Sequence, residues 1–265
     1  MTESSDREPT GEGALAGLRA AVTAGAGGVG LVTATTLAAQ GADVFVCDVD
    51  DAAVGQLPAH LRGVVVDVAD PEQIEDWLGP IAEGGLDILI NNAGIAGPTR
   101  PIEEITSDEW RQCLAVDLDA MFHCVRVVVP AMKAAGSGCI VNMTSTAGLM
   151  GMPNRTPYVV AKYGVVGLTE TLAMELGPQG IRVNAIAPGS VNGERMDRVV
   201  AAHAEAEGIG EAEVRELYTK GVSMGRFIDA DEIADLIVYL SGRSGRSING
   251  QIIAVDGNTE TLWPR

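Results

Sequence analysis

Basic residues are scarce in this sequence, which has 18 Lys and Arg against 36 Asp and Glu and a formal net charge of −18. Proteins that bind nucleic acid or anionic membranes neutralise dense phosphate arrays with clustered Lys and Arg. The composition therefore argues against both partners. Long apolar runs are missing too, because none is long enough to span a bilayer and the polar N-terminus has no apolar signal core. We expect a cytoplasmic protein.

Cysteine is also scarce. The four cysteines, at 47, 113, 124 and 139, form no C-x-x-C pair and have no His at metal-ligand spacing. We interpret them as reduced core thiols and predict no metal site. Aromatic residues make up only 4% of the chain, whereas Gly occurs 33 times. Such small residues suit close packing of helices on a sheet.

Strand and helix patterns alternate along the whole chain, which at 265 residues is long enough for one large α/β domain. This rhythm predicts a parallel, doubly wound sheet of about seven strands with helices on both faces. We expect residues 1–14 to be a disordered acidic tail and 15–265 to be a single domain. The strand-like apolar runs lie near 19–24, 42–47, 63–67, 86–90, 138–143, 181–187 and 251–255.

The chemistry is expected between Ile140 and Lys162, where Ser145 follows a predicted strand and Tyr158 and Lys162 share one helix face. A phenol normally holds its proton at neutral pH, and an ammonium one turn away favours the phenolate. Such a site can take a proton from an alcohol or return one to a carbonyl, with Ser145 holding the substrate oxygen. Y-x-x-x-K alone is common, however, and usually marks a solvated helix face.

A glycine turn follows the first predicted strand. Gly25, Gly27 and Gly30 match G-x-G-x-x-G between a strand and a helix, where backbone amides can approach a pyrophosphate. Asp48 ends the second predicted strand and can accept hydrogen bonds from a ribose diol while repelling a 2′-phosphate. No Lys or Arg occurs in the glycine turn or in 48–56, so we predict NAD rather than NADP. The alternative for Asp48 is a turn residue.

Polar residues mark the ends of the next strands. Asp67 and Val68 suit contact with an adenine, and N-N-A-G (91–94) leaves room for a flat ligand, although as a turn it is ordinary. A capping box, Thr106 with Glu109, starts a long helix running towards Pro130. That helix carries Asp117, which is costly to bury unless it is paired and would otherwise be partly exposed.

The segment 192–226 leaves the edge of the sheet at which ligands bind. We interpret it as a helical lid over the substrate, and a surface helical hairpin is the alternative. Arg155 is either a group that pairs with a substrate carboxylate or a solvated loop residue.

The glycine turn, N-N-A-G, Ser145, Y-x-x-x-K, P-G-S-V (188–191) and I-N-G-Q-I-I-A-V-D-G (248–257) together resemble the compact branch of the short-chain dehydrogenase/reductase family. The resemblance covers roughly 15–258 and implies a Rossmann-type fold, a homotetramer, and Tyr158 as general acid/base assisted by Lys162 and Ser145. It places Asp117 at the fourth catalytic position. It places the cofactor against Gly25, Gly27, Val29, Gly30, Asp48, Asp67, Val68, Asn92, Ala93, Gly94, Tyr158, Lys162, Pro188, Gly189 and Val191.

Three positions depart from the family pattern. Ala24 replaces the first glycine of the turn, and we expect little loss because Gly25 adjoins it. Gly193 replaces a Thr that contacts the nicotinamide amide, and Asn192 is a candidate substitute. Asp117 replaces an Asn that acts largely through its backbone carbonyl. We expect the proton relay to survive with an altered pH dependence.

Three functions remain open. The first is an NAD-dependent dehydrogenase that oxidises a secondary alcohol, as a small-molecule substrate, to a ketone. The second is a ketone or 3-oxoacyl reductase with the same site, although no basic patch for an acidic carrier protein is evident. The third is a non-catalytic dinucleotide-binding regulator, against which the complete set of Ser145, Tyr158 and Lys162 argues. The substrate stays undefined: cyclic apolar alcohols, sugars and polyols all remain candidates.

Overall fold

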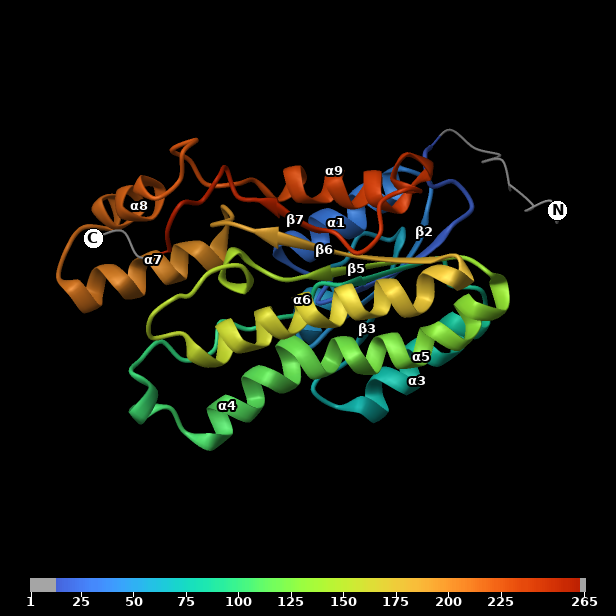
Figure 1. Ribbon diagram of the computed structural model, residues 1–265, viewed down its shortest axis with the longest axis horizontal. Coiled ribbons are helices and arrows are strands. Elements are labelled where there is room, and N and C mark those ends of the chain that lie inside the picture. The colour runs from blue at the N-terminus through green and yellow to red at the C-terminus, as the bar shows by residue number, and fades with distance from the viewer. Residues whose placement is uncertain (1–12, 263–265) are drawn as a thin grey trace.

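Seven parallel strands form one sheet in the described part of the chain (Figure 1). The computed structural model describes residues 13–262, apart from the side chains at 202, 203, 206 and 207. The strand order is β3-β2-β1-β4-β5-β6-β7. The strands are β1 Arg19–Thr23, β2 Asp43–Asp48, β3 Leu61–Val65, β4 Ile88–Asn91, β5 Gly138–Met143, β6 Ile181–Pro188 and β7 Ile252–Val255.

The strand order reverses beside β1. The chain moves outward from β1 to β3, returns to place β4 against the other side of β1, and then continues outward to β7. Connections that leave in opposite directions open a crevice at the carboxyl ends of the two central strands. The ends of β1 and β4 are therefore the place where a ligand is expected.

Helices cover both faces of the sheet, as the alternating pattern predicted (Figure 1). On one face α1 and α9 pack with Leu37 and Ile237 in the core, and on the other α3, α5 and α6 enclose Leu78 and Val128. The predicted doubly wound α/β class is confirmed. The helices are α1 Gly28–Ala39, α2 Asp51–Val54, α3 Pro71–Glu83, α4 Ser107–Leu114, α5 Ala120–Ala135, α6 Thr156–Leu176, α7 Glu194–Glu207, α8 Glu211–Lys220 and α9 Ala230–Ser241.

The long helix predicted from Thr106 is interrupted and extended. Thr106 and Glu109 do form the capping box of α4, but a π-helical turn, Ala115–Asp119, separates α4 from α5. The helical path towards Pro130 continues beyond it, because α5 ends only at Ala135. Pro130 lies on the exposed side while buried neighbours pack on the core, so tertiary packing outweighs the missing backbone hydrogen bond.

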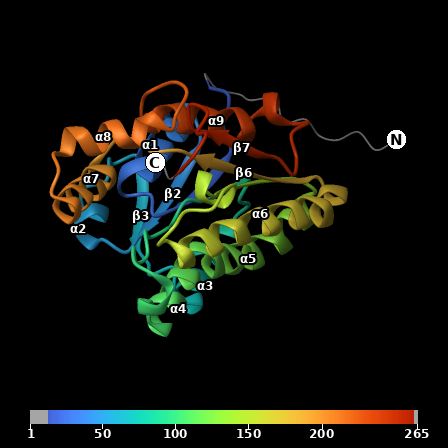
Figure 2. The same ribbon diagram turned by 60° about the vertical axis from the view of Figure 1, so that its left-hand side comes forward.

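Two helices extend from the carboxyl edge after β6 (Figure 2). Here α7 and α8 pack on each other through buried Val200, Ala204 and Val214. No helix within residues 13–262 combines the length and apolarity that crossing a bilayer demands. Of the predicted disordered tail, 1–12 lies outside the described residues, and the Ala14 amide bonds to the Gln40 side chain.

Candidate active site

A buried ion pair lies beneath the carboxyl ends of β4 and β5. Lys162 Nζ is 3.0 Å from Asp117 Oδ1, and the two side chains are 4% and 0% exposed. The same Nζ donates to the Met143 carbonyl at 3.1 Å, at the end of β5. The Thr144 hydroxyl donates to the Lys162 carbonyl at 2.7 Å and ties α6 to that strand. The ammonium is therefore held from two sides.

Asp117 lies in the π-helical turn, and such irregular turns often occur at functional positions in helices. Its Oδ2 accepts the Ile95 amide at 3.3 Å and lies 3.5 Å from Cys113 Sγ. Burial, and then the charge of Asp117, raise the pKa of Cys113 to about 12, so the thiol stays protonated. A Cβ at Gly94 would lie 2.7 Å from Oδ1, which explains the small residue there. The partly exposed alternative for Asp117 is wrong.

Tyr158 lies half-buried on the first turn of α6. Lys162 Nζ is 5.6 Å from the centroid of its ring. Ser145 follows β5, and its Oγ accepts the Ala147 amide at 3.2 Å. The structure thus brings Tyr158, Lys162 and Asp117 together around the end of β5, where Ser145 also lies. No hydrogen bond joins Ser145 directly to Tyr158 within residues 13–262.

The glycine turn is fixed by side chains from β1 and β4. Asn92 Nδ2 donates to the carbonyls of Thr23 and Ala24, both at 3.0 Å. The Thr23 hydroxyl accepts the amides of Asn92 and Ala93 at 2.9 and 3.0 Å. A Cβ at Gly30 would lie 2.0 Å from the Ala24 carbonyl oxygen. Sequence reasoning missed Thr23, whose only signal is a polar residue ending an apolar strand.

Ala24 has a left-handed backbone, with φ at 49°. That conformation costs a non-glycine residue about 1 kcal/mol. The glycine that the family usually has at this position avoids that cost. The neighbouring Gly25 does not remove the cost at Ala24. Gly25 instead packs so closely on Val46 that an added Cβ would lie 2.7 Å from Cγ1.

The turn and Asp48 together fit a dinucleotide. The first turn of α1 holds no acidic residue and no side-chain cap, and a Cβ at Gly27 would meet only open space. The backbone amides at the start of α1 suit an anion such as a pyrophosphate. Asp48 Oδ2 accepts the Ala26 amide at 3.0 Å, which sets the carboxylate against the turn. Since a carboxylate has about four lone-pair positions, Asp48 keeps acceptors for a ribose diol.

The remaining predicted cofactor positions lie along the same carboxyl edge. Asp67 Oδ1 accepts the Ala69 amide, and Val68 is 9% exposed beside it. Val29 packs partly against the core near α1. After β6, which ends at Pro188, the Gly189 amide bonds to Val255, and Val191 pairs with Ile228. Asn192, the candidate for the amide contact, donates instead to Asp229 at 2.6 Å.

Arg155 is buried, so its interpretation as a solvated loop residue is wrong. The residue is 8% exposed, and Nη2 donates to the Ala96 carbonyl at 2.6 Å. Its Cζ lies 4.9 Å from the centroid of the Tyr158 ring. A cation therefore flanks the proposed reacting group on a second side.

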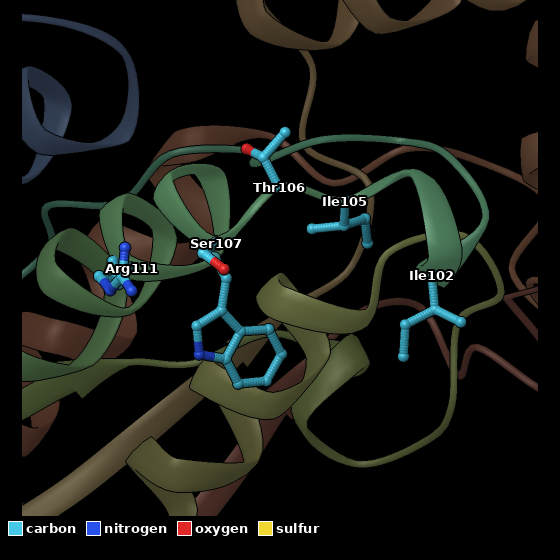
Figure 3. Close-up of a pocket in the computed structure, with 6 residues that line it drawn as sticks. Ile102, Ile105, Thr106, Ser107 and Arg111 are labelled. Atoms are coloured by element: carbon cyan, nitrogen blue, oxygen red, sulfur yellow. The ribbon is translucent and has the colours of Figure 1, made fainter.

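A surface pocket lies at the start of α4, apart from these residues (Figure 3). Its volume is about 450 Å³, and its lining combines apolar side chains with Arg111, which pairs with Asp108. None of the predicted site residues lines it, so we assign it no part in the chemistry. The lining residues are Ile102, Ile105, Thr106, Ser107, Trp110 and Arg111.

Comparison with known proteins decides the family. A family model described as enoyl-(acyl carrier protein) reductase matches residues 23–258. The chain belongs to the short-chain dehydrogenase/reductase family. D-beta-hydroxybutyrate dehydrogenase of Rhizobium meliloti (strain 1021) is 34% identical over 250 residues, covering 90% of this chain and 96% of that protein. Trans-4-hydroxycyclohexanecarboxylate dehydrogenase of Sinomonas cyclohexanicum is 37% identical over 254 residues, covering 90% and 91%.

A solved structure agrees with this assignment. The crystal structure of NAD⁺-bound xylitol dehydrogenase superposes with a TM-score of 0.87 at 30% identity, covering 92% of this chain and 99% of that one. As a member of the short-chain dehydrogenase/reductase family, the protein is an oxidoreductase that interconverts alcohols and carbonyl compounds with a nicotinamide dinucleotide.

Proposed function

We propose that the protein is an NAD-dependent dehydrogenase that oxidises a secondary alcohol to a ketone. The observation that carries the proposal is the buried Lys162 ammonium beside the Tyr158 ring, at 5.6 Å from its centroid. A fixed cation at this distance stabilises a phenolate, which is the form that accepts a proton from an alcohol. In this family the dinucleotide supplies the hydride acceptor.

Each residue then has a defined part. The Ser145 hydroxyl holds the alcohol oxygen, and Tyr158 takes the hydroxyl proton while the carbonyl bond forms. Lys162 keeps the phenolate form accessible. Asp117 holds the ammonium in place against the Met143 carbonyl. The helices α7 and α8 serve as a lid over the substrate. The charge of Arg155 lowers the pKa of Tyr218 on α8, while burial raises it more, and this coupling supports the assignment.

The preference for NAD rests on Asp48. A 2′-phosphate at the adenosine ribose would meet this carboxylate, which the Ala26 amide holds in place. We expect NADH production from a panel of secondary alcohols, with kcat/KM at least about 100-fold higher for NAD than for NADP, because like charges at close range cost several kcal/mol. Asp48→Asn keeps an acceptor for the amide and should lower that ratio at least about tenfold.

The matched control is Asp51→Asn, an exposed acid in the first turn of α2, which should leave the ratio unchanged. Strong NADP turnover by the native enzyme would contradict the proposed preference. Failure of every alcohol and ketone, with NADH still bound, would contradict the proposed dehydrogenase.

Reduction of a ketone or 3-oxoacyl thioester is the second candidate. Similarity to the 3-oxoacyl-(acyl-carrier-protein) reductase of Thermotoga maritima, 31% identical over 245 residues, favours testing it. The same residues would then act in reverse, with Tyr158 donating the proton. Dependence of reduction on an acyl carrier protein distinguishes the two functions, and the net charge of −18 argues against docking of an acidic carrier.

We further propose a cytoplasmic homotetramer. Apolar side chains are exposed along α5 and α6, including Phe122 at 50%, Tyr163 at 46% and Met174 at 80%. Such a surface supports burial against a second copy. Light scattering of the purified protein should give four times the chain mass of 27.5 kDa, and a monomer would refute this assembly.

A further inference from the structure

Arg155 is a buried cation, and one of its hydrogen-bond donors has no partner in the described part of the chain. Its Nη2 bonds to the Ala96 carbonyl, whereas Nε has no hydrogen-bond partner among residues 13–262. Arg155 as a whole residue is 8% exposed, and burial of a charged group normally requires a paired carboxylate in return. Within the described residues, Arg155 takes part in no ion pair.

A second arginine, Arg195 on α7, acts on Arg155 through its charge. Burial is the largest cause that lowers the pKa of Arg155, and the cation of Arg195 on α7 lowers it further, while Tyr158 acts in the opposite direction. Arg195 is exposed and, in the described part of the chain, also belongs to no ion pair. Neither arginine therefore has an ion-pair partner among residues 13–262.

Two carboxylates of these segments already have partners, and Glu194 beside Arg195 is exposed to solvent at the start of α7. Asp117 pairs with Lys162, and Asp197, which follows Arg195 on α7, pairs with Arg215 of α8. Acidic residues outnumber basic ones twofold in this sequence, 36 to 18, so an unmatched pair of arginines is not explained by composition.

We propose that Arg155 binds a carboxylate of the substrate, so that the alcohol oxidised is a hydroxy acid. This proposal rests on the proposed dehydrogenase. The guanidinium lies over the ring of Tyr158, with Cζ 4.9 Å from its centroid, so hydroxyl and carboxylate must be separated by only a few bonds. A guanidinium matches a carboxylate in a planar, two-bond geometry, and Arg195 adds a second positive charge from the lid.

The test compares each acid with its uncharged ester. NADH production is measured with 3-hydroxybutyrate and 4-hydroxycyclohexanecarboxylate, each beside its methyl ester, for the native enzyme and for Arg155→Gln. We expect kcat/KM for the better acid to exceed that of its ester about 10- to 100-fold. In Arg155→Gln that advantage should disappear through a higher KM for the acid. The ester has no carboxylate to lose, so its kcat/KM should fall far less than that of the acid.

Arginines on α7 supply the matched control. Arg195→Ala should raise KM for the acid severalfold, whereas Arg198→Ala, which removes another exposed arginine of the same helix, should not. An equal loss on acid and ester in Arg155→Gln would mean that Arg155 only positions the Ala96 loop, and would overturn the proposal. Equal rates on acid and ester in the native enzyme would overturn it too, with the dehydrogenase intact.

Failure of the proposed function has a different signature. If no alcohol is oxidised, calorimetry of the NADH complex with butyrate and cyclohexanecarboxylate, which carry no hydroxyl, still tests Arg155. Binding by the native protein that Arg155→Gln loses and Arg198→Ala keeps supports the carboxylate site. No binding by the native protein overturns it.

Discussion

Replacing Tyr158 with Phe is expected to lower kcat for alcohol oxidation at least about 1,000-fold. The change removes only the hydroxyl that takes the proton, and proton transfer by a positioned group contributes about 10²–10⁴ in rate. NADH binding, measured by fluorescence, should stay within about threefold, because the ring still packs beside Lys162 and Arg155. The steady-state rate with a responding alcohol is the measurement.

The matched control lies on the same helix. Tyr163→Phe removes a hydroxyl from a ring that is 46% exposed, and it should leave kcat unchanged. A Tyr158→Phe enzyme that keeps more than about a tenth of native activity would show that another group takes the proton. A matching loss in both variants would point to a general effect of altering α6.

The fold could be predicted because its signals are local. Apolar runs of strand length alternate with helical patterns, and the observed strands lie within about two residues of the predicted ones. The interruption before α5 could not be predicted, because a π-helical turn shifts side chains without changing the apolar pattern. The continuation of α5 past Pro130 could not be predicted for a related reason, because it depends on the packing of neighbouring residues on the core.

The candidate site likewise contains residues that the sequence predicts and residues that it does not. The sequence predicts Gly25, Gly30 and Asp48. A strand–turn–helix unit that binds a dinucleotide requires small residues in the turn and an acid at the end of the next strand. The sequence does not predict which groups contact Asp117, or that Arg155 is buried. Both depend on contacts between segments far apart in sequence: Asp117 with Lys162, and Arg155 with Ala96.

Removing the carboxylate of Asp117 with Leu is expected to lower the free energy of unfolding by about 3–5 kcal/mol. The substitution leaves the Lys162 ammonium, 4% exposed, without its counter-charge in a dry interior. Urea unfolding at fixed protein concentration measures the change. Asp119→Leu, at an exposed position of the same π-helical turn, should shift stability by no more than about 0.5 kcal/mol.

A double substitution separates the ion pair from simple packing. Asp117→Leu combined with Lys162→Met removes both charges. The double variant should therefore be more stable than the Asp117→Leu single variant. Additive losses would mean that the two side chains contribute separately, through volume and the Met143 contact, and would contradict the coupling inferred from their 3.0 Å separation.

The milder change Asp117→Asn tests the chemistry of the pair, because it restores the residue that the family usually has. Removing the negative charge leaves the Lys162 ammonium less neutralised, and its field at Tyr158 then favours the phenolate more strongly. We therefore expect kcat/KM for alcohol oxidation, measured at one fixed near-neutral pH beside the native enzyme, to rise severalfold. An unchanged kcat/KM would mean that Asp117 only holds Lys162 in place, and that its charge does not reach the proton-transfer step.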